Sequence, residues 1–355
     1  MLPDAGFHNA KRVITRWDGY AVTPLHDLPA LAREARLGAL RLKDEATRFG
    51  LGSFKALGGA YAVALAAADA GDRAITVTCA TDGNHGRAVA WGAQRFGCGC
   101  VIFVHQGVSQ RRVDAIARHG ADVRRVPGTY DDSVREAAQQ AETNGWLLVS
   151  DTSWEGYTDV PRDIMQGYRL MADEAADQWR GERPTHVFIQ GGVGGVAAAV
   201  SVQLRQRFRP APALVVVEPD RAACLLASAE LGAPTAVPGN LDTLMAGLAC
   251  GEPSLLAWRE LDHAAAAFMA IPDAAAVASM RLLATCGIVG GESGVAGLAG
   301  CLLAAADPAA RETLGIDRNS RVLAFNTEGA TDPELFRQLV GTPPEDLQAY
   351  RNLRG

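Results

Sequence analysis

The sequence predicts an α/β protein of two lobes, each built on an open, mostly parallel β-sheet flanked by helices. Two observations predict this class. Short runs of β-branched and other apolar residues alternate with helical patterns through the middle of the chain, as they do in the βαβ units of a parallel sheet. Glycine-rich segments directly follow several of these runs, at the place where an open α/β sheet binds its ligands.

A first block of alternating elements spans residues 72–150, which we expect to form a small lobe. Its apolar runs are short enough for strands, and helical patterns of about three turns lie between them. The expected strands are residues 75–80, 100–104, 122–126 and 146–150, and the expected helices are residues 85–96, 110–119 and 131–144.

Residues 1–71 and 151–355 are expected to form the larger lobe. Its strands are apolar nearly throughout, which is typical of strands that are buried on both faces. Strands are expected at residues 186–190, 213–218 and 321–326, and helices at residues 61–68, 156–178, 196–208, 273–286 and 295–306.

The composition excludes several classes of protein. The 34 Lys and Arg residues and 40 Asp and Glu residues give a net charge of −6, whereas a nucleic-acid-binding surface is basic. The longest stretch of apolar residues and glycine, 191–200, has about half the length of a membrane span, and the first residues contain no apolar segment of a signal peptide. We therefore expect no nucleic-acid or membrane partner and a cytoplasmic location.

Metal binding is not indicated by the spacing of potential ligands. The seven cysteines are scattered and form no C-x-x-C motif, so we interpret them as reduced thiols. Glu292 could line a cation site, but a packing role explains this residue equally well.

The glycine loop Gly191-Gly192-Val193-Gly194-Gly195 lies between an expected strand and an expected helix. Successive backbone amides can converge on an anion there, and the start of a helix favours negative charge. The loop lacks the GK[ST] of a P-loop. Glu218 lies near the distance at which a dinucleotide fold places its acidic residue, so the loop alone leaves the cofactor open. A turn for close packing of helix and strand is the alternative.

A second turn, Thr81-Asp82-Gly83-Asn84-His85-Gly86, follows the strand expected at residues 75–80. Its amides could hold a carboxylate at the start of a helix. An ordinary turn with a helix cap is the alternative interpretation.

Lys55 lies in an apolar segment, where burial is expected to lower its pKa and to make the amine nucleophilic. Only three lysines occur among the 34 cationic residues, and Arg cannot replace lysine in a Schiff base. A lysine whose amine reaches solvent at the edge of a helix is the alternative. Together, a Schiff-base lysine, an anion-binding loop and a carboxylate-binding turn suit pyridoxal 5′-phosphate (PLP) better than a nicotinamide.

Six segments of the chain are similar to one enzyme family. The chain resembles the fold type II PLP-dependent enzymes, which share the two-lobed fold of the tryptophan synthase β-subunit, and among them the diaminopropionate ammonia-lyases. The matching segments are KDEATRFGLGSFKALGGAYA (43–62), ATDGNHGRAVAWGAQRFG (80–97), DTSWEGYTDVPRDIMQGY (151–168), MAGLACGEPS (245–254), GGESGV (290–295) and NTEGATDP (326–333).

The resemblance implies a set of cofactor contacts, most of them in the large lobe. Lys55 would form the Schiff base with PLP, and Asn84 would hydrogen-bond its phenolic oxygen. Residues Gly191, Gly192, Val193, Gly194 and Gly195 would bind the phosphate. Thr327 would face the pyridine nitrogen, and a neutral hydroxyl there would leave this nitrogen largely unprotonated, which suits β-elimination better than transamination.

The resemblance also implies how the substrate is bound. Thr81, Gly83 and His85 would hold its carboxylate in a mobile small lobe. Asp82 would bind the β-ammonium group or act as a second base, so that Lys55 and Asp82 would take the α-proton from opposite enantiomers. Asp151 would recognise the second amino group, and a cap for a helix at residues 154–166 is the alternative for Asp151.

The implied activity is elimination of ammonia from L- and D-2,3-diaminopropionate to give pyruvate and two ammonia molecules, by a homodimer. A serine or threonine dehydratase, or another β-eliminating or β-replacing enzyme of this fold, is one alternative. A hydroxyl leaving group needs no carboxylate beside it, which argues against a dehydratase. A catalytically inactive ligand sensor is another alternative, although neither the lysine nor the phosphate loop is lost.

Overall fold

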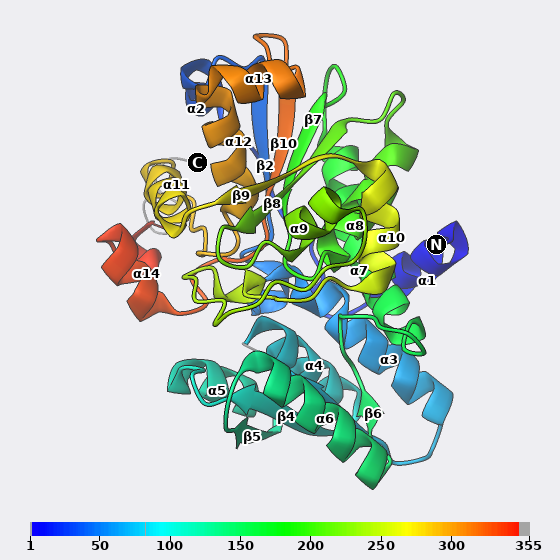
Figure 1. Cartoon of the computed structure of the whole chain (residues 1–355). Coiled ribbons are helices and arrows are strands. Elements are labelled where there is room, and N and C mark those ends of the chain that lie inside the picture. The colour runs from blue at the N-terminus through cyan, green and yellow to red at the C-terminus, as the bar shows by residue number, and fades with distance from the viewer. Residues whose placement is uncertain (1, 82, 348–355) are drawn as a thin grey trace.

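The computed structural model describes residues 2–81 and 83–347, and two separate β-sheets organise them (Figure 1). The six-stranded sheet, in the upper half of the figure, has the order β1-β2-β10-β7-β8-β9. The four-stranded sheet below it has the order β5-β4-β3-β6. All strand pairs are parallel except β1 with β2. The predicted α/β class with mostly parallel sheets is confirmed.

The four-stranded sheet and its helices are called the small lobe below. The sheet consists of β3 (Thr76–Ala80), β4 (Gly99–His105), β5 (Asp122–Val126) and β6 (Leu147–Leu148), with helices α4 (Asn84–Phe96), α5 (Gln110–Ala117) and α6 (Tyr130–Asn144). Ser109 caps α5, and Thr129 forms a capping box with Asp132 at α6. The expected strand at residues 146–150 is shorter than predicted, because β6 pairs only with β3 and the carbonyl of Val149 binds His85 instead.

The large lobe contains the six-stranded sheet. Its strands are β1 (Leu25–Asp27), β2 (Ala39–Asp44), β7 (His186–Gln190), β8 (Ala213–Pro219), β9 (Ala265–Ile271) and β10 (Arg321–Asn326). The sequence analysis missed β1, β2 and β9. Strand β2 carries charged residues that are buried only because they find partners in the fold, and β9 is rich in alanine, which favours strands weakly. The boundaries of the two lobes stay a prediction.

Helices cover both faces of the large sheet. Val187, Ile189 and Phe325 pack on the side of α7 and α8, and Phe188 and Ala324 pack on the opposite side with α11 and α12. Besides α4, α5 and α6, the described residues form the helices α1 (Asp4–Ile14), α2 (Pro29–Glu34), α3 (Gly59–Ala70), α7 (Asp159–Gln178), α8 (Gly195–Arg207), α9 (Cys224–Leu231), α10 (Leu255–Ala264), α11 (Asp273–Thr285), α12 (Ala296–Ala306), α13 (Pro308–Leu314) and α14 (Pro333–Val340), with short 3-10 helices η1 (Arg48–Gly50), η2 (Phe54–Leu57) and η3 (Ala246–Leu248). No helix in the described ranges is long and apolar enough to cross a membrane.

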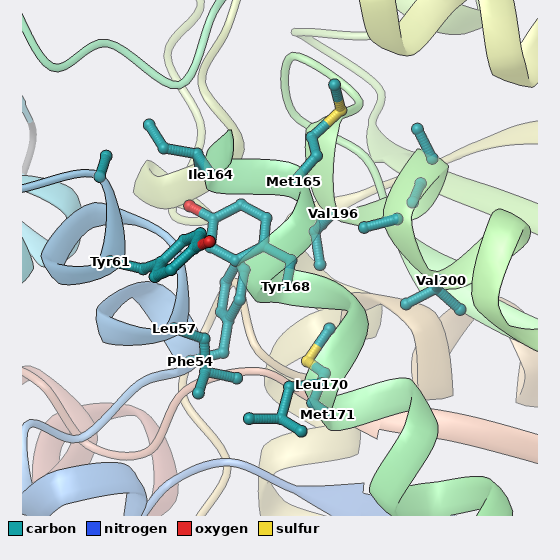
Figure 2. Close-up of a cluster of buried hydrophobic side chains, with 14 of the residues drawn as sticks. Phe54, Leu57, Tyr61, Ile164, Met165, Tyr168, Leu170, Met171, Val196 and Val200 are labelled. Atoms are coloured by element: carbon teal, nitrogen blue, oxygen red, sulfur yellow. The ribbon is translucent and has the colours of Figure 1, made fainter. Parts of the chain in front are cut away.

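The segment that carries Lys55 is anchored in the core. Figure 2 shows Phe54 and Leu57 of η2 beside Tyr168 of α7, in a cluster that is buried from solvent. A Cβ added at Gly58 would lie 2.4 Å from Cε1 of Tyr168, and one at Gly167 would lie 1.8 Å from the carbonyl oxygen of Leu57. Both positions therefore require glycine, and the two backbones can approach closely because of it.

A buried ionic cluster joins β2 and η1, which precede Lys55 in the chain, to α7. The guanidinium group of Arg48 donates to both carboxylate oxygens of Glu45, at 2.8 and 2.9 Å, and to both of Glu174, at 2.9 and 2.7 Å. The ammonium group of Lys43 donates to Glu174 at 2.7 Å. These side chains are almost completely buried, so their charges are stable there only because each has a partner of opposite sign.

Replacing Arg48 by alanine would leave Glu45 without its cation and would remove one of two cations from Glu174. We expect the free energy of unfolding to fall by about 3–5 kcal/mol, as for other buried pairs that lose one partner, in urea unfolding experiments. The matched control is Arg135→Ala, because Arg135 pairs with Asp132 and its side chain is 71% exposed. An exposed pair contributes about 0–1 kcal/mol, and equal losses in the two variants would contradict this interpretation.

Candidate active site

A cavity lies between the two lobes, at the carboxyl ends of β3, β7 and β10. It encloses about 950 Å³, including open solvent at its mouth. Nearly all the expected site residues line it, and they come from both sheets: Lys55, Thr81, Gly83, Asn84, His85, Asp151, Gly192, Val193, Gly194, Gly195 and Thr327. Gly191 is not among the lining residues, and Asp82 lies outside the described residues. Folding thus brings together segments that are up to 272 positions apart, from Lys55 to Thr327.

Lys55 forms an ion pair with Asp151 in this cavity. Nζ of Lys55 lies 2.5 Å from Oδ2 of Asp151, and the two side chains are 20% and 12% exposed. Burial acts to lower the pKa of Lys55, but attraction to the Asp151 carboxylate outweighs burial and raises this pKa. Burial acts to raise the pKa of Asp151, but attraction to the Lys55 ammonium group outweighs burial and lowers this pKa. The expectation of a lowered lysine pKa is therefore wrong, because the sequence did not reveal the partner carboxylate.

His85 presents an unused lone pair to the same carboxylate. Its Nε2 lies 2.7 Å from the carbonyl oxygen of Val149, which can only accept, so Nε2 carries the hydrogen. Burial lowers the pKa of His85 and favours its neutral form. Its Nδ1 is buried without a hydrogen-bond partner and lies 3.8 Å from Oδ2 of Asp151. A neutral His85 and Asp151 thus offer two adjacent acceptors.

The turn after β3 is held by the hydroxyl group of Thr81. Its Oγ1 accepts hydrogen bonds from the amides of Gly83, at 2.9 Å, and Gly86, at 3.0 Å. Gly83 has a φ of 151°, a conformation that L-residues with side chains rarely adopt. Thr81 therefore shapes the turn through its side chain.

Asn84 is the first residue of α4, and both the nitrogen and the oxygen of its side-chain amide form hydrogen bonds. Its Nδ2 donates to a carboxylate oxygen of Glu328, and its Oδ1 accepts from Arg87 at 2.9 Å. One hydrogen of the Asn84 amide group remains for a ligand, because this group carries two.

The glycine loop fits an anion such as a phosphate. The amide of Gly191 donates to Val217 in the sheet, whereas the amides of residues 192–195 make no recorded hydrogen bond within the described part of the chain. Gly194 has a φ of 96° and precedes α8 directly. Unpaired amides at the start of a helix attract negative charge, and Lys55 supplies an amine for an aldehyde in the same cavity. The residues present therefore fit PLP.

Gly191 has a packing role in the loop. A Cβ at this position would lie 2.7 Å from Cγ1 of Val216 and 2.8 Å from Cδ1 of Leu225, so the alternative of close packing applies to this first glycine.

Several cavity residues were missed by the sequence analysis. Gln190 ends β7 directly before the glycine loop and donates to Thr327. Tyr168 has a buried hydroxyl group without a hydrogen-bond partner. Glu328 accepts from Asn84 and, at 3.0 Å, from the amide of Ser293. Gln190 and Glu328 could have been found from the sequence, because each is adjacent to a predicted site residue.

The structure shows the partners of Glu218 and Glu292, the two acidic residues for which the sequence left alternatives open. Glu218 accepts hydrogen bonds from the amides of Leu225 and Leu226 at 2.8 Å each. Its carboxylate is therefore occupied at the start of α9, whereas the acidic residue of a dinucleotide fold binds the ribose of its ligand. Glu292 pairs with Arg112 of the small lobe at 2.8 Å. Burial, together with repulsion from Glu328, raises the pKa of Glu292 to about 7. No cluster that could hold a metal ion is found among the described residues.

Comparison with known proteins gives consistent matches. Residues 16–327 match the family of pyridoxal-phosphate dependent enzymes. The chain is 41% identical to diaminopropionate ammonia-lyase of Escherichia coli over 350 residues, which cover 91% of this chain and 88% of the relative. It is 30% identical to an L-threonine dehydratase of Salmonella typhimurium, but over only 62% of this chain and 40% of that protein.

Solved structures of the Escherichia coli diaminopropionate ammonia-lyase are also similar to this fold. The complex with D-serine has a TM-score of 0.90 at 38% identity and covers 96% of this chain and 92% of that chain. The complex with an aminoacrylate-PLP azomethine reaction intermediate has a TM-score of 0.87 at 38% identity and covers 96% and 92%.

The ion pair of Lys55 with Asp151 is expected to affect the pH at which Lys55 reacts with PLP. The raised pKa keeps Lys55 protonated at neutral pH, so little neutral amine is present to attack an aldehyde. Asp151→Asn removes the attraction while burial remains, so the pKa of Lys55 falls and the neutral fraction at a given pH rises. We expect the pH midpoint of PLP uptake, followed by Schiff-base absorbance, to move to lower pH.

The control for this experiment is Asp159→Asn, because the Asp159 side chain is 88% exposed at the start of α7. It should leave the midpoint unchanged. A midpoint of Asp151→Asn that is equal to or higher than that of the unmodified chain would refute the role assigned to the ion pair.

Proposed function

We propose a function from the premise that the chain belongs to the pyridoxal-phosphate dependent enzymes and, within them, to the diaminopropionate ammonia-lyase family. The family, the fold type II class and the cofactor expected from the sequence motifs are thereby confirmed. The chain is a PLP-dependent carbon–nitrogen lyase. It converts 2,3-diaminopropionate and water into pyruvate and two ammonia molecules. The observation that carries this proposal is the pairing of Lys55 with Asp151 beside a free anion-binding loop.

PLP, when bound, supplies an electron sink that stabilises negative charge on the substrate's α-carbon. The residues of the chain hold and orient the reactants around it. Lys55 would provide the amine that binds the cofactor, and Nζ of the free lysine would take the α-proton of the L-isomer. The amides of residues 192–195 would hold the phosphate, and the Asn84 amide would hydrogen-bond the phenolic oxygen. Asp82 takes the α-proton of the D-isomer.

Asp151 and His85 form the site for the β-ammonium group of the substrate. Oδ2 of Asp151 already holds one primary ammonium, that of Lys55, at 2.5 Å. Nδ1 of His85 is a second acceptor 3.8 Å from this oxygen, so one ammonium group can donate to both. A serine hydroxyl has a single hydrogen and no charge, and it would satisfy this pair poorly.

The small lobe closes over the substrate carboxylate. The backbone amides of the segment at residues 81–85 bind this carboxylate. Contacts between the lobes support closure, since Arg112 pairs with Glu292 and Asn84 with Glu328. Closure excludes water from the reacting carbon. We further propose that the enzyme works as a homodimer in the cytoplasm.

Substrate preference tests this function. We expect a higher kcat/KM for 2,3-diaminopropionate than for serine or threonine. Asp151→Asn should lower the value for diaminopropionate by about 10- to 150-fold, as expected for a hydrogen bond to a charged group, and the value for serine by a much smaller factor. Asp159→Asn is the control. A tenfold higher kcat/KM for a hydroxyl substrate in the unmodified enzyme would instead indicate a dehydratase.

The two enantiomers test the role of Asp82. Asp82→Asn removes a general base without changing the size of the side chain, so we expect it to abolish turnover of D-diaminopropionate and to retain much of the turnover of the L-isomer. Steady-state assays on each isomer measure this. Equal losses on both would mean that Asp82 binds the substrate and is not an enantiomer-specific base.

A further inference from the structure

The side-chain amide of Gln190 lies at the floor of the cavity, between the backbone and Thr327. We propose that Gln190 is a positioning residue: it fixes the hydroxyl group of Thr327 as a hydrogen-bond donor to the ring nitrogen of PLP, and thereby favours elimination over transamination. This inference rests on the proposed function.

The orientation of the Gln190 amide follows from its partners. Its nitrogen Nε2 lies 2.7 Å from the carbonyl oxygen of Gly294 and 2.5 Å from Oγ1 of Thr327. A carbonyl oxygen can only accept, so the amide nitrogen must face Gly294. The reverse orientation would place two oxygens against each other and would leave the amide nitrogen where Oε1 is now, buried and without a partner.

The orientation of the Thr327 hydroxyl follows in turn. Its oxygen accepts from Gln190, so its own hydrogen is not used in that contact. Among the described residues, no hydrogen bond donated by this hydroxyl is recorded, although the residue is 3% exposed and lines the cavity. The hydrogen is therefore left for an acceptor in the cavity, and a ring nitrogen with a free lone pair is such an acceptor.

A protonated ring nitrogen would fit this arrangement less well. It would donate to Thr327, whose hydrogen would then be buried without an acceptor, and such groups destabilise the state that contains them. The neighbouring carboxylate of Glu328 is engaged by Asn84 and Ser293. Gln190 thus selects the unprotonated ring, which withdraws electrons less strongly and allows the β-substituent to leave before the cofactor can be protonated.

Gln190→Met tests the proposal, because methionine has similar length and volume but no donor. Without the amide, Thr327 can present a lone pair, so protonation of the ring nitrogen should increase. The readout is the ¹⁵N NMR shift of the ring nitrogen in holoenzyme reconstituted with ¹⁵N-labelled PLP. Transamination, in which the α-amino group stays on the cofactor and the keto acid leaves, should rise at least about fivefold relative to elimination, the factor for one buried unpaired group.

Thr327→Val provides the control for an effect that acts through the hydroxyl. In this background Gln190→Met should change neither the ¹⁵N shift nor the product ratio. If Gln190→Met alters the circular dichroism spectrum, Gln190→Glu replaces it, since its carboxylate would draw the Thr327 hydrogen away and shift the signal in the same direction.

Two results would overturn the inference. One is an unchanged ¹⁵N shift in folded holoenzyme of both Gln190 variants, and the other is an equal shift with and without Thr327. Neither result would affect the proposed function. Failure of the unmodified chain to bind PLP at Lys55 would overturn the proposed function itself, and this inference with it.

Discussion

The close approach of η2 to α7 is the constraint on which the rest of the site depends. Two glycines, Gly58 and Gly167, leave room for the backbone of one element against the other. Phe54 and Leu57 are then buried, and Lys55, which lies between them in sequence, is directed into the cavity rather than into solvent. A flexible lysine becomes a fixed one because its neighbours are part of the core, and a fixed amine can react with little loss of entropy.

Buried charges occur in two settings in this structure, a cluster around Arg48 and the ion pair of Lys55 with Asp151. In the cluster around Arg48, each carboxylate has a protein cation, and nothing remains for a ligand. In the cavity, the cation beside Asp151 is Lys55, the lysine that we propose to bind the cofactor. Under the proposed function, Lys55 would no longer be the partner of Asp151 once it binds the cofactor, and a buried carboxylate that loses a cation has a strong preference for a new one. The proposed affinity of the site for the substrate's ammonium group follows from this preference of Asp151 for a cation.

Nearly all the residues that the sequence marked as a site line one cavity, whereas three strands of the large sheet were missed. Strands with apolar residues throughout, such as β7 and β8, were found because both faces are buried. Strand β2 was missed because Lys43 is compatible with a buried strand only when Glu174 lies opposite, 131 positions away. The same limit applies to the pKa of Lys55, whose direction depends on Asp151, 96 positions away. Local patterns identify residues, whereas the sign of their electrostatic interactions depends on contacts that local patterns do not contain.

Backbone carbonyl groups determine which side-chain atoms of the site donate hydrogen bonds and which accept them. Carbonyl oxygens cannot donate, so a backbone carbonyl beside the site fixes the hydrogen-bonding role of the side chain that contacts it. Gly294 fixes the amide of Gln190, which fixes the hydroxyl of Thr327. Val149 fixes the ring of His85 and leaves Nδ1 as an acceptor. The fold therefore determines which atoms donate and which accept before any ligand arrives, and groups without charge can then control the protonation of what they bind.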